Sequence, residues 1–367
     1  MKKNKCTLIV DGNWLLMSSF NRIRNEFDKE NDLEQRKNAK NQLINNISYT
    51  IISTLNQFPG VIDNVMFVRD KSSWRKSIEK PLMCMDDNYK GTRVYDIALD
   101  WDMIFGSLDE IQENLKDLNI SWMCEEGVEG DDWMWFWSRY LNRNNINCIV
   151  WSSDCDLKQL VQQDKNTRCW TAWWNKRSGL TVHECYNINN IDVMSILLGE
   201  TIENVSMNNL QKCVAGSYNI EYINPNDIIN EKIMMGDISD NIKSLIRVKK
   251  NKKTSNVSKK DWQDLKEHFE LDKEGQLEQQ IDTIIDYLLS KKKFQECTYT
   301  KEEIKDMFNY NKTLVMLNEN IIPQHIKDAM NKHIDEYDIC DISQLKEHLT
   351  EKNSNDNYID LLVQNLI

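Results

Sequence analysis

The segment VWSSDCDLKQL, residues 150–160, joins an apolar run to two aspartates that stand one residue apart. The run NCIVW (147–151) has the length and composition of a buried strand, and Asp154 and Asp156 follow it after two serines. Two carboxylates about 6 Å apart repel each other by roughly 3 kcal/mol at an effective dielectric constant near 20. A pair placed at the end of a strand therefore suggests that a cation binds there.

Three further apolar runs have the character of strands and alternate with longer amphipathic runs. The strands expected are CTLIV (6–10), VMFV (65–68), ISWMC (120–124) and NCIVW (147–151). The helices expected between them are 40–57, 107–118 and 131–143. This alternation is typical of an α/β fold with a mostly parallel sheet flanked by helices. From about Asn226 the pattern is almost purely helical, so we expect domains at 1–225 and 226–367.

Each predicted strand is followed by acidic residues. They are Asp11, Asp70, Glu129, Asp131, Asp132, Asp154 and Asp156, and the later GDISDN segment adds Asp237 and Asp240. One strand-terminal aspartate is most often a turn former or helix cap. Four strands that end alike indicate a site, because open α/β sheets bind ligands at their carboxyl edge. Oxygen ligands without His or Cys favour Mg²⁺ or Mn²⁺, and this many carboxylates suits two ions that act on phosphorus.

Composition excludes several other classes of protein. The 367 residues are 40% hydrophobic and include 12 Trp, which is typical of a globular chain. Ten dispersed cysteines without C-x-x-C spacing, and five scattered His, disfavour structural zinc and a disulfide framework. No apolar run approaches the roughly 20 residues of a membrane span, and Asp11 makes the first apolar run too short for a signal peptide. We therefore expect a cytoplasmic protein with no membrane contact.

Two clusters have a functional and a structural interpretation. The net charge of −12 argues weakly against nucleic acid, but residues 241–260 contain seven Lys, one Arg and no acid. Such a run is either a solvated loop or a surface that contacts phosphates. The aromatic run 133–137 could stack on bases, but its helical spacing favours packing of a helix against the sheet. The same reasoning favours packing for Trp173 and Trp174.

Six segments, in this order, resemble the flap endonuclease/5′-nuclease family. They are LIVDGN (8–13), FVRDKSSWRK (67–76), DDNYKGTR (86–93), EGVEGDD (126–132), SSDCDLKQL (152–160) and GDISDN (236–241). Within the family they are most similar to the ribonucleases H of T-even bacteriophages, as is the tail at 308–337. The resemblance spans most of the chain and implies a PIN-like nuclease domain, followed by a duplex-binding domain with a helix–three-turn–helix type motif.

The resemblance also implies the ligands of two Mg²⁺ ions, for which Mn²⁺ can substitute. The first ion would be surrounded by Asp11, Asp70, Glu129 and Asp131. The second would be surrounded by Asp131, Asp154, Asp156 and Asp240, with Asp237 close by. Asp132 would support these ligands without touching the metals.

Further residues have implied roles in holding the nucleic acid. Residues 72–100 would form an arch over the active site, in which Tyr89 stacks on a base and Lys90 and Arg93 offset charge on the phosphate. Other cations would contact the DNA backbone, namely Arg75, Lys76, Lys243, Arg247, Lys249, Lys250, Lys252 and Lys253. The Gly-rich hairpin of the family, with its monovalent ion, has no counterpart here. The segment 192–224 is longer than in the phage enzymes, and its sequence indicates no role.

The activity implied is 5′→3′ exonuclease, flap endonuclease and ribonuclease H cleavage of phosphodiesters. Substrates would be duplex DNA with a 5′ flap, nick or gap, and RNA·DNA hybrids at primers, during replication or repair. The enzyme would act as a monomer. A single-strand-binding protein or a sliding clamp would be compatible with it as a partner. Abundant Asn and Lys with few Pro and Gly point to an AT-rich genome such as that of a phage, which would place the protein in the host cytoplasm.

Three alternatives stay open. A haloacid-dehalogenase-type phosphatase also has strand-end aspartates, but it needs a second Asp two residues after its nucleophile, where this chain has Asn13 after Asp11. A catalytically inactive DNA-structure-binding protein would be expected to replace carboxylates by Asn or Ser, and every expected position here is acidic. A toxin-type PIN ribonuclease would be far shorter and would lack the helical tail.

Overall fold

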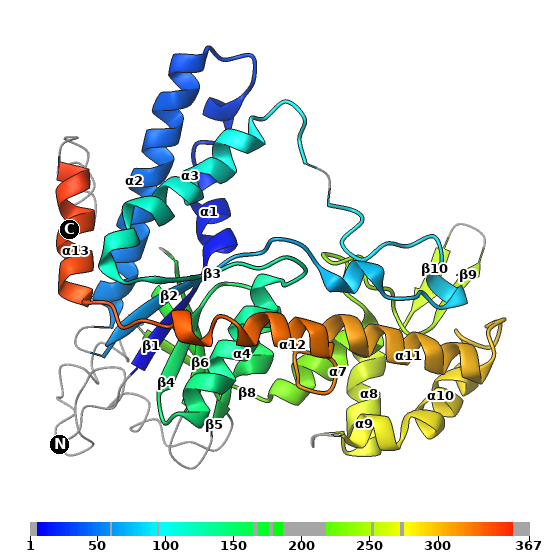
Figure 1. The fold of residues 1–367 in the computed structure, drawn as a ribbon. Coiled ribbons are helices and arrows are strands. Elements are labelled where there is room, and N and C mark those ends of the chain that lie inside the picture. Colours follow the sequence, from blue (N-terminus) through cyan, green and yellow to red (C-terminus); the bar gives the residue numbers. More distant parts are fainter. Residues whose placement is uncertain are drawn as a thin grey trace. The chain divides into compact units, whose positions relative to one another are not determined.

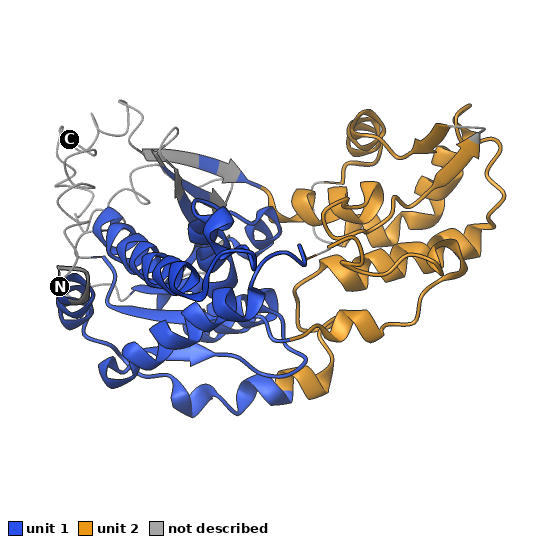
Figure 2. Cartoon of the chain, turned by 90° about the horizontal axis from the view of Figure 1, so that it is seen from above, with its two compact units in different colours: residues 1–71, 96–223, 328–367 blue, residues 72–95, 224–327 orange. Residues whose placement is uncertain are grey.

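The computed structural model describes residues 6–58, 61–93, 95–163, 168–175, 179–185, 218–250, 253–271 and 275–354 (Figure 1). These residues form two compact units, which Figure 2 shows in different colours. Unit 1 comprises Met1–Lys71, Asp96–Ile223 and Asp328–Ile367, and unit 2 comprises Ser72–Tyr95 and Asn224–Lys327. Each unit has its own hydrophobic core, and each is described by itself below.

Unit 1 is built on a mostly parallel sheet. Its strands are β1 (Cys6–Asp11), β2 (Asn64–Val68), β3 (Ser121–Met123), β4 (Asn147–Trp151), β5 (Gln162–Gln163), β6 (Arg168–Asn175), β7 (Gly179–Cys185) and β8 (Tyr218–Ile223). The order is β3-β2-β1-β4-β6-β7-β8, with β5 paired to β6. Among the strands that the structure describes, the β5–β6 and β6–β7 pairs are antiparallel and the others are parallel. β1 is therefore central, between β2 and β4, so the predicted strand ends lie side by side.

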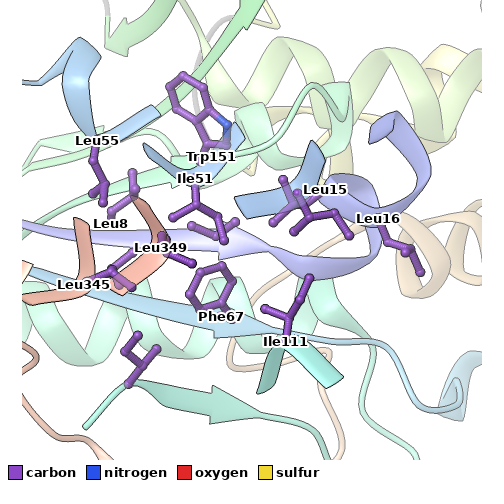
Figure 3. Packing of buried hydrophobic residues seen from close by; sticks show 14 of the residues in the cluster. Leu8, Leu15, Leu16, Ile51, Leu55, Phe67, Ile111, Trp151, Leu345 and Leu349 are labelled. Atoms are coloured by element: carbon purple, nitrogen blue, oxygen red, sulfur yellow. The ribbon is translucent and has the colours of Figure 1, made fainter. Parts of the chain in front are cut away.

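Helices cover both faces of this sheet. The α-helices of unit 1 are α1 (Gly12–Phe20), α2 (Leu33–Gln57), α3 (Trp101–Asn114), α4 (Gly130–Arg143) and α13 (Ile342–Ser354). Alternate strand residues such as Leu8 and Phe67 pack with Leu15, Ile51 and Ile111 from α1, α2 and α3 (Figure 3). This period-2 pattern sends Ile9 and Val150 to the opposite face, where both are fully buried.

The opposite face is covered by α4, which confirms the structural interpretation of the aromatic run. Trp133 and Trp137 are fully buried, and α4 lies against β1, β2, β4 and β6. Their rings also contact the returning C-terminal segment, where Trp137 stacks on Tyr337 with centroids 5.2 Å apart. The run therefore fixes α4 on the sheet, and the N-terminus of α4 carries the EGDD acids.

Unit 2 is helical apart from one hairpin. Its elements are α7 (Pro225–Met235), α8 (Lys259–Phe269), α9 (Gln276–Gln279), α10 (Ile281–Ser290), α11 (Lys301–Val315), α12 (Gln324–Asn331), the strands β9 (Arg247–Lys250) and β10 (Lys253–Asn256), and the 3₁₀ turns η2 (Trp74–Ser77) and η3 (Leu82–Cys84). α12 continues past Lys327 into unit 1. Thr300 and Ser258 form capping boxes at the starts of α11 and α8. Among the described helices, none has the length and apolar character that a bilayer crossing requires.

The units divide the chain differently from the expected boundary at residue 225. Met83, Cys84 and Tyr89 from the predicted arch are buried in the core of unit 2, so residues 72–95 belong there. The C-terminal segment returns to unit 1, where Leu345 and Leu349 of α13 join the core (Figure 3). Apolar burial decides both assignments, and a sequence pattern does not show which core an apolar residue joins.

Candidate metal centre

Asp11 ends β1 and caps α1 at the carboxyl edge of the sheet. Its Oδ1 accepts a hydrogen bond from the Trp14 N–H at 2.9 Å, and its Oδ2 accepts one from Ser152 Oγ at 3.0 Å. Ser152 directly follows β4, which pairs with β1 in parallel. The cap thus holds the Asp11 carboxylate at the point where β1 and β4 both end.

Asp70 lies two residues beyond β2, and hydrogen bonds with Asn13 and Gly130 hold it in place. Asn13 donates from Nδ2 to Asp70 Oδ2 at 3.1 Å, and its Oδ1 accepts the Asp70 N–H at 3.2 Å. The Gly130 N–H donates to Asp70 Oδ1. A Cβ at Gly130 would lie 3.0 Å from that oxygen, so glycine allows the carboxylate to approach the start of α4 closely.

The acids of EGDD divide into two roles at the N-terminus of α4. Glu129 and Asp132 form a capping box, in which the Glu129 N–H donates to Asp132 Oδ2 at 3.2 Å. Both are buried, at 3% and 0% exposure. Asp131 stands between them and is only partly buried. Asp132 therefore holds the start of α4 and Glu129 serves as the helix cap, while the expected role of Asp132 beside the metal ligands stays a prediction.

Asp154 and Asp156 follow β4 and begin the turn η5 (Cys155–Leu160). Asp154 Oδ1 accepts the Asp156 N–H at 2.9 Å, and the Asp154 N–H donates to Ser152 Oγ at 3.2 Å. Ser152 therefore links Asp154 to Asp11, since its hydroxyl donates to Asp11 Oδ2. The D-x-D pair lies beside the end of β1, because β4 pairs with β1 in parallel.

Burial and neighbouring charge both act on the carboxyl group of Asp11. Burial raises the pKa of Asp11 to about 7, and the carboxylates of Asp70 and Asp154 add to the increase. The hydrogen bonds from Trp14 and Ser152 oppose it. Among the described residues, Asp11 is surrounded by neutral hydrogen-bond donors and by other carboxylates. A divalent cation suits this donor set, because it would offset the repulsion and bind oxygen ligands only.

The assignment of individual ligands is a separate matter. Among the described residues, no three acidic, His or Cys side chains are arranged as a ready-made cage for one ion. Asp237 and Asp240 belong to unit 2, whereas the other predicted ligands belong to unit 1. Membership of the metal set therefore stays a prediction for each residue.

Unit 2 brings together the predicted residues of the arch and of GDISDN. Asp240 Oδ1 pairs with Arg93 Nη2 at 2.5 Å, and its backbone carbonyl accepts the Lys90 N–H at 2.8 Å. Tyr89 is 8% exposed, and its hydroxyl lies 3.4 Å from Asp240 Oδ2. These contacts hold residues 89–93 against the turn that carries Asp240.

Asp237 is held by a lysine of α7 and by a serine of its own turn. Burial alone would raise the pKa of its carboxyl group, but hydrogen bonds from Lys232 (2.5 Å) and Ser239 outweigh burial and lower the pKa. Asp237 is therefore ionised and paired with a cation already present in unit 2.

The predicted phosphate contacts lie in three different environments. Lys243 and Arg247 both pair with Asp87, at 3.1 and 3.3 Å. Arg75 is 2% exposed and lies over the ring of Trp74, whereas Lys76 is exposed. Each of these DNA contacts remains a prediction.

The β9–β10 hairpin presents the remaining lysines. Lys249 and Lys253 are exposed, and Lys250 lies directly opposite Lys253 in the register. Contact of these lysines with phosphates stays a prediction. Lys252 and most of the segment 192–224 lie outside the described residues.

Sequence reasoning missed three residues that organise the carboxylates. Asn13 orients Asp70, Ser152 joins Asp11 to Asp154, and Gly130 makes room for Asp70. Each stands beside an expected ligand, in LIVDGN, SSDCD and EGDD respectively. Their signal was a polar or small residue next to a strand-end acid, but their partners lie on other strands.

Comparison with known proteins adds an independent finding. Residues 6–190, half of the chain, match the family model described as 5'-3' exonuclease, N-terminal resolvase-like domain. The search of curated proteins returned no match.

Solved structures from bacteriophage T5 resemble the chain over 95% of its length and 99% of theirs. One is the T5 D15 protein co-crystallised with metal ions, at 16% identity and a TM-score of 0.50. Two others are the T5 5'-exonuclease with divalent zinc ions bound (17%, 0.48) and the T5 D15 flap endonuclease in a pseudo-enzyme-product complex with DNA and metal ions (17%, 0.47). At this identity the first likeness shows the fold: an α/β unit with a mostly parallel sheet, followed by a helical region.

Proposed function

The chain belongs to the 5'-3' exonuclease family defined by the N-terminal resolvase-like domain, and from this premise we propose that it is a structure-selective, divalent-metal-dependent 5′→3′ nuclease. It would hydrolyse a phosphodiester near the junction of single and double strands and leave a 5′-phosphate. The observation that carries the proposal is the environment of Asp11. A carboxylate whose pKa is raised to about 7 by burial and by two neighbouring acids is adapted to a bound cation.

Two Mg²⁺ ions are the proposed cofactor, and Mn²⁺ would substitute for them. Asp11, Asp70, Glu129 and Asp131 are proposed to hold the first ion, and Asp131, Asp154 and Asp156 the second, with Asp237 and Asp240 as further predicted ligands. When bound, such ions activate water and stabilise charge on the phosphate oxygens. The T5 D15 protein was crystallised with metal ions, which supports the same class of cofactor here.

The side chains of this chain would position the reacting groups. Asn13 would fix the orientation of the Asp70 carboxylate through its two hydrogen bonds. Ser152 would keep Asp11 and Asp154 at a constant separation, because it contacts both. We propose that Lys90 and Arg93 offset negative charge on the phosphate, a role that would require Arg93 to exchange its ion pair with Asp240 for one with the substrate.

The proposed substrates are duplex DNA with a 5′ flap, nick or gap, and RNA·DNA hybrids at primer ends. The similarity of the tail at 308–337 to the ribonucleases H of T-even phages supports RNA primers as one target. The T5 D15 flap endonuclease was crystallised with DNA, which supports a DNA substrate. We propose a monomer that works in the host cytoplasm of a phage, with a single-strand-binding protein or sliding clamp as a potential partner class.

Cleavage of defined substrates tests this function. The purified protein is incubated with a 5′-labelled flap, a nicked duplex and an RNA·DNA hybrid, in Mg²⁺ and in EDTA. The proposal predicts cleavage near the junction in Mg²⁺ only. Binding without cleavage would favour a catalytically inactive DNA-structure-binding protein. The absence of both binding and cleavage would refute the nuclease proposal.

A further inference from the structure

Ile238 has the highest exposure among the large apolar side chains of the described residues, at 96%. It stands in the turn between Asp237 and Asp240 in unit 2. A single exposed apolar residue is common on protein surfaces and is not by itself a site. The turn that carries Ile238 and the charges around it give this residue a more specific meaning.

The turn is closed by hydrogen bonds that keep Ile238 pointing outward. Asp237 and Ile242 exchange two backbone hydrogen bonds, of 2.9 and 2.7 Å. Asp237 Oδ1 accepts the N–H of Ser239 at 2.8 Å and its hydroxyl at 2.6 Å. Gly236, at φ 78°, packs so tightly below the turn that a Cβ there would lie 2.5 Å from the Ile242 carbonyl. Withdrawing Ile238 from solvent would therefore require these bonds to break.

The same turn gathers positive charge. Each of three turn residues holds a cation: Lys232 on Asp237 at 2.5 Å, Arg93 on Asp240 at 2.5 Å and Lys243 on Asn241 at 2.6 Å. The backbone of Lys90 is joined to the same turn through the Asp240 carbonyl. Lys243 also pairs with Asp87 at 3.1 Å, so four cations stand here beside three carboxylates, and the local balance still favours an anionic ligand.

Tyr89 does not contribute an exposed apolar surface to this part of unit 2. It was expected to stack on a base, but it is only 8% exposed and belongs to the hydrophobic core of the unit. Ile238 is nearly fully exposed on the turn against which residues 89–93 pack. A ligand held by the surrounding cations would therefore meet an aliphatic side chain before it met an aromatic ring.

A partner with phosphates and flat apolar faces fits this arrangement, and nucleic acid has both. In a continuous duplex, neighbouring bases cover both faces of each base pair, and inserting an apolar side chain costs a few kcal/mol of unstacking. At a gap or flap one base face is open, and at a nick the broken backbone lets the two flanking base pairs separate at a lower cost than in a continuous duplex. We propose that Ile238 packs against this open face and so makes the protein prefer interrupted duplexes over continuous ones. The inference rests on the proposed nuclease function and names a residue that sets its substrate selectivity.

Binding in EDTA tests the inference without cleavage. Fluorescence anisotropy compares a nicked and a continuous duplex of the same sequence, with parent protein, Ile238→Ala, Ile238→Leu and Ile339→Ala. Ile339 is a matched control, since it is 64% exposed and belongs to unit 1. A second readout is 2-aminopurine placed at the nick, whose fluorescence should rise when an aliphatic side chain replaces its stacking neighbour.

Ile238→Ala is expected to weaken binding to the nicked duplex about tenfold, which corresponds to about 1.4 kcal/mol for partial burial of one isoleucine. Binding to the continuous duplex should change less than about twofold, and the 2-aminopurine signal should disappear. Ile238→Leu should restore both, and Ile339→Ala should match the parent. An equal loss on both duplexes, or no loss, would overturn the inference. If the inference about Ile238 fails but the parent protein cuts the flap in Mg²⁺, the nuclease proposal stands. If the parent protein neither binds nor cuts, the nuclease proposal and the inference about Ile238 are both refuted.

Discussion

Asp11→Asn is expected to stabilise the metal-free protein at pH 8, although it removes a proposed metal ligand. Burial and the carboxylates of Asp70 and Asp154 raise the pKa of Asp11 from the ordinary 3.8 to about 7. The folded state then binds a proton that the unfolded state has lost, so the free energy of unfolding falls as the pH rises between these values. The destabilisation of the folded state by the Asp11 carboxylate is nearly absent at pH 4 and is complete above pH 7.

The magnitude follows from the size of the shift. About 3 pKa units at 1.36 kcal/mol each give at most about 4 kcal/mol. Asparagine can still accept the Trp14 N–H but replaces the charge-assisted hydrogen bond from Ser152 by a weaker one, at a cost of about 1 kcal/mol. Asp11 is also only partly buried, so solvent screens some of the repulsion. We therefore expect a net gain of about 1–3 kcal/mol at pH 8 that disappears at pH 4.

Urea unfolding in EDTA at pH 4 and pH 8 measures this difference. Asp32→Asn is the matched control, because Asp32 caps α2 through the Gln35 N–H at 2.8 Å and is exposed. It should change the free energy of unfolding by less than about 0.5 kcal/mol at pH 8. Added Mg²⁺ should stabilise the parent more than Asp11→Asn. A variant that is less stable than the parent at pH 8, or equally stabilised at both pH values, would refute the reasoning.

Three more predictions concern cleavage, duplex binding and stability. Asp156→Asn should keep duplex binding and lower Mg²⁺-dependent cleavage of a 5′-labelled flap by at least about 100-fold, and cleavage at the parental rate would exclude the metal role. A second change replaces four lysines by Ala, namely Lys249, Lys250, Lys252 and Lys253. It should weaken binding to all DNA sequences alike and lower the slope of log K against log [salt] by about 0.9 per lost phosphate contact. An unchanged slope would mean that these lysines form a solvated loop. Burial alone would raise the pKa of Asp261, but hydrogen bonds from Lys293 and Ser258 outweigh it and lower the pKa well below its usual range. Asp261→Asn should therefore cost about 2–4 kcal/mol at pH 7 and progressively less below pH 4, and a cost in urea unfolding that persists undiminished at pH 3 would contradict this.

The sequence predicted the sheet well where burial and pattern agree. The runs that became β1, β2, β3 and β4 are short, apolar and followed by acids, so their type, approximate bounds and parallel arrangement could be inferred. The helix expected at 40–57 begins at Leu33 instead, because Asp32 caps a polar first segment without apolar periodicity. The strands β6 and β7 were not expected, because the Trp-rich sequence at 168–175 has no acid after it and no helix before it.

The candidate site was predicted by residue type but not by contact. Strand ends place Asp11, Asp70 and Asp154 at one edge, because parallel pairing alone determines that edge. The bridging role of Ser152 depends on the register between β1 and β4, which the sequence does not give. The burial of Tyr89 and the exposure of Ile238 depend on how a loop packs into the core of unit 2, and no periodic pattern reports this.

Anomalous X-ray scattering from crystals grown with Mn²⁺ would test most directly whether these acids form a metal centre. The proposed function predicts two anomalous peaks beside the ends of β1, β2 and β4, about 3.5–4 Å apart and within about 2.2 Å of carboxylate oxygens, with Asp11 among the ligands. Crystals of Asp11→Asn should lose at least one peak. Absence of manganese from this edge, with the carboxylates of Asp11, Asp70 and Asp154 turned away from one another, would contradict the account.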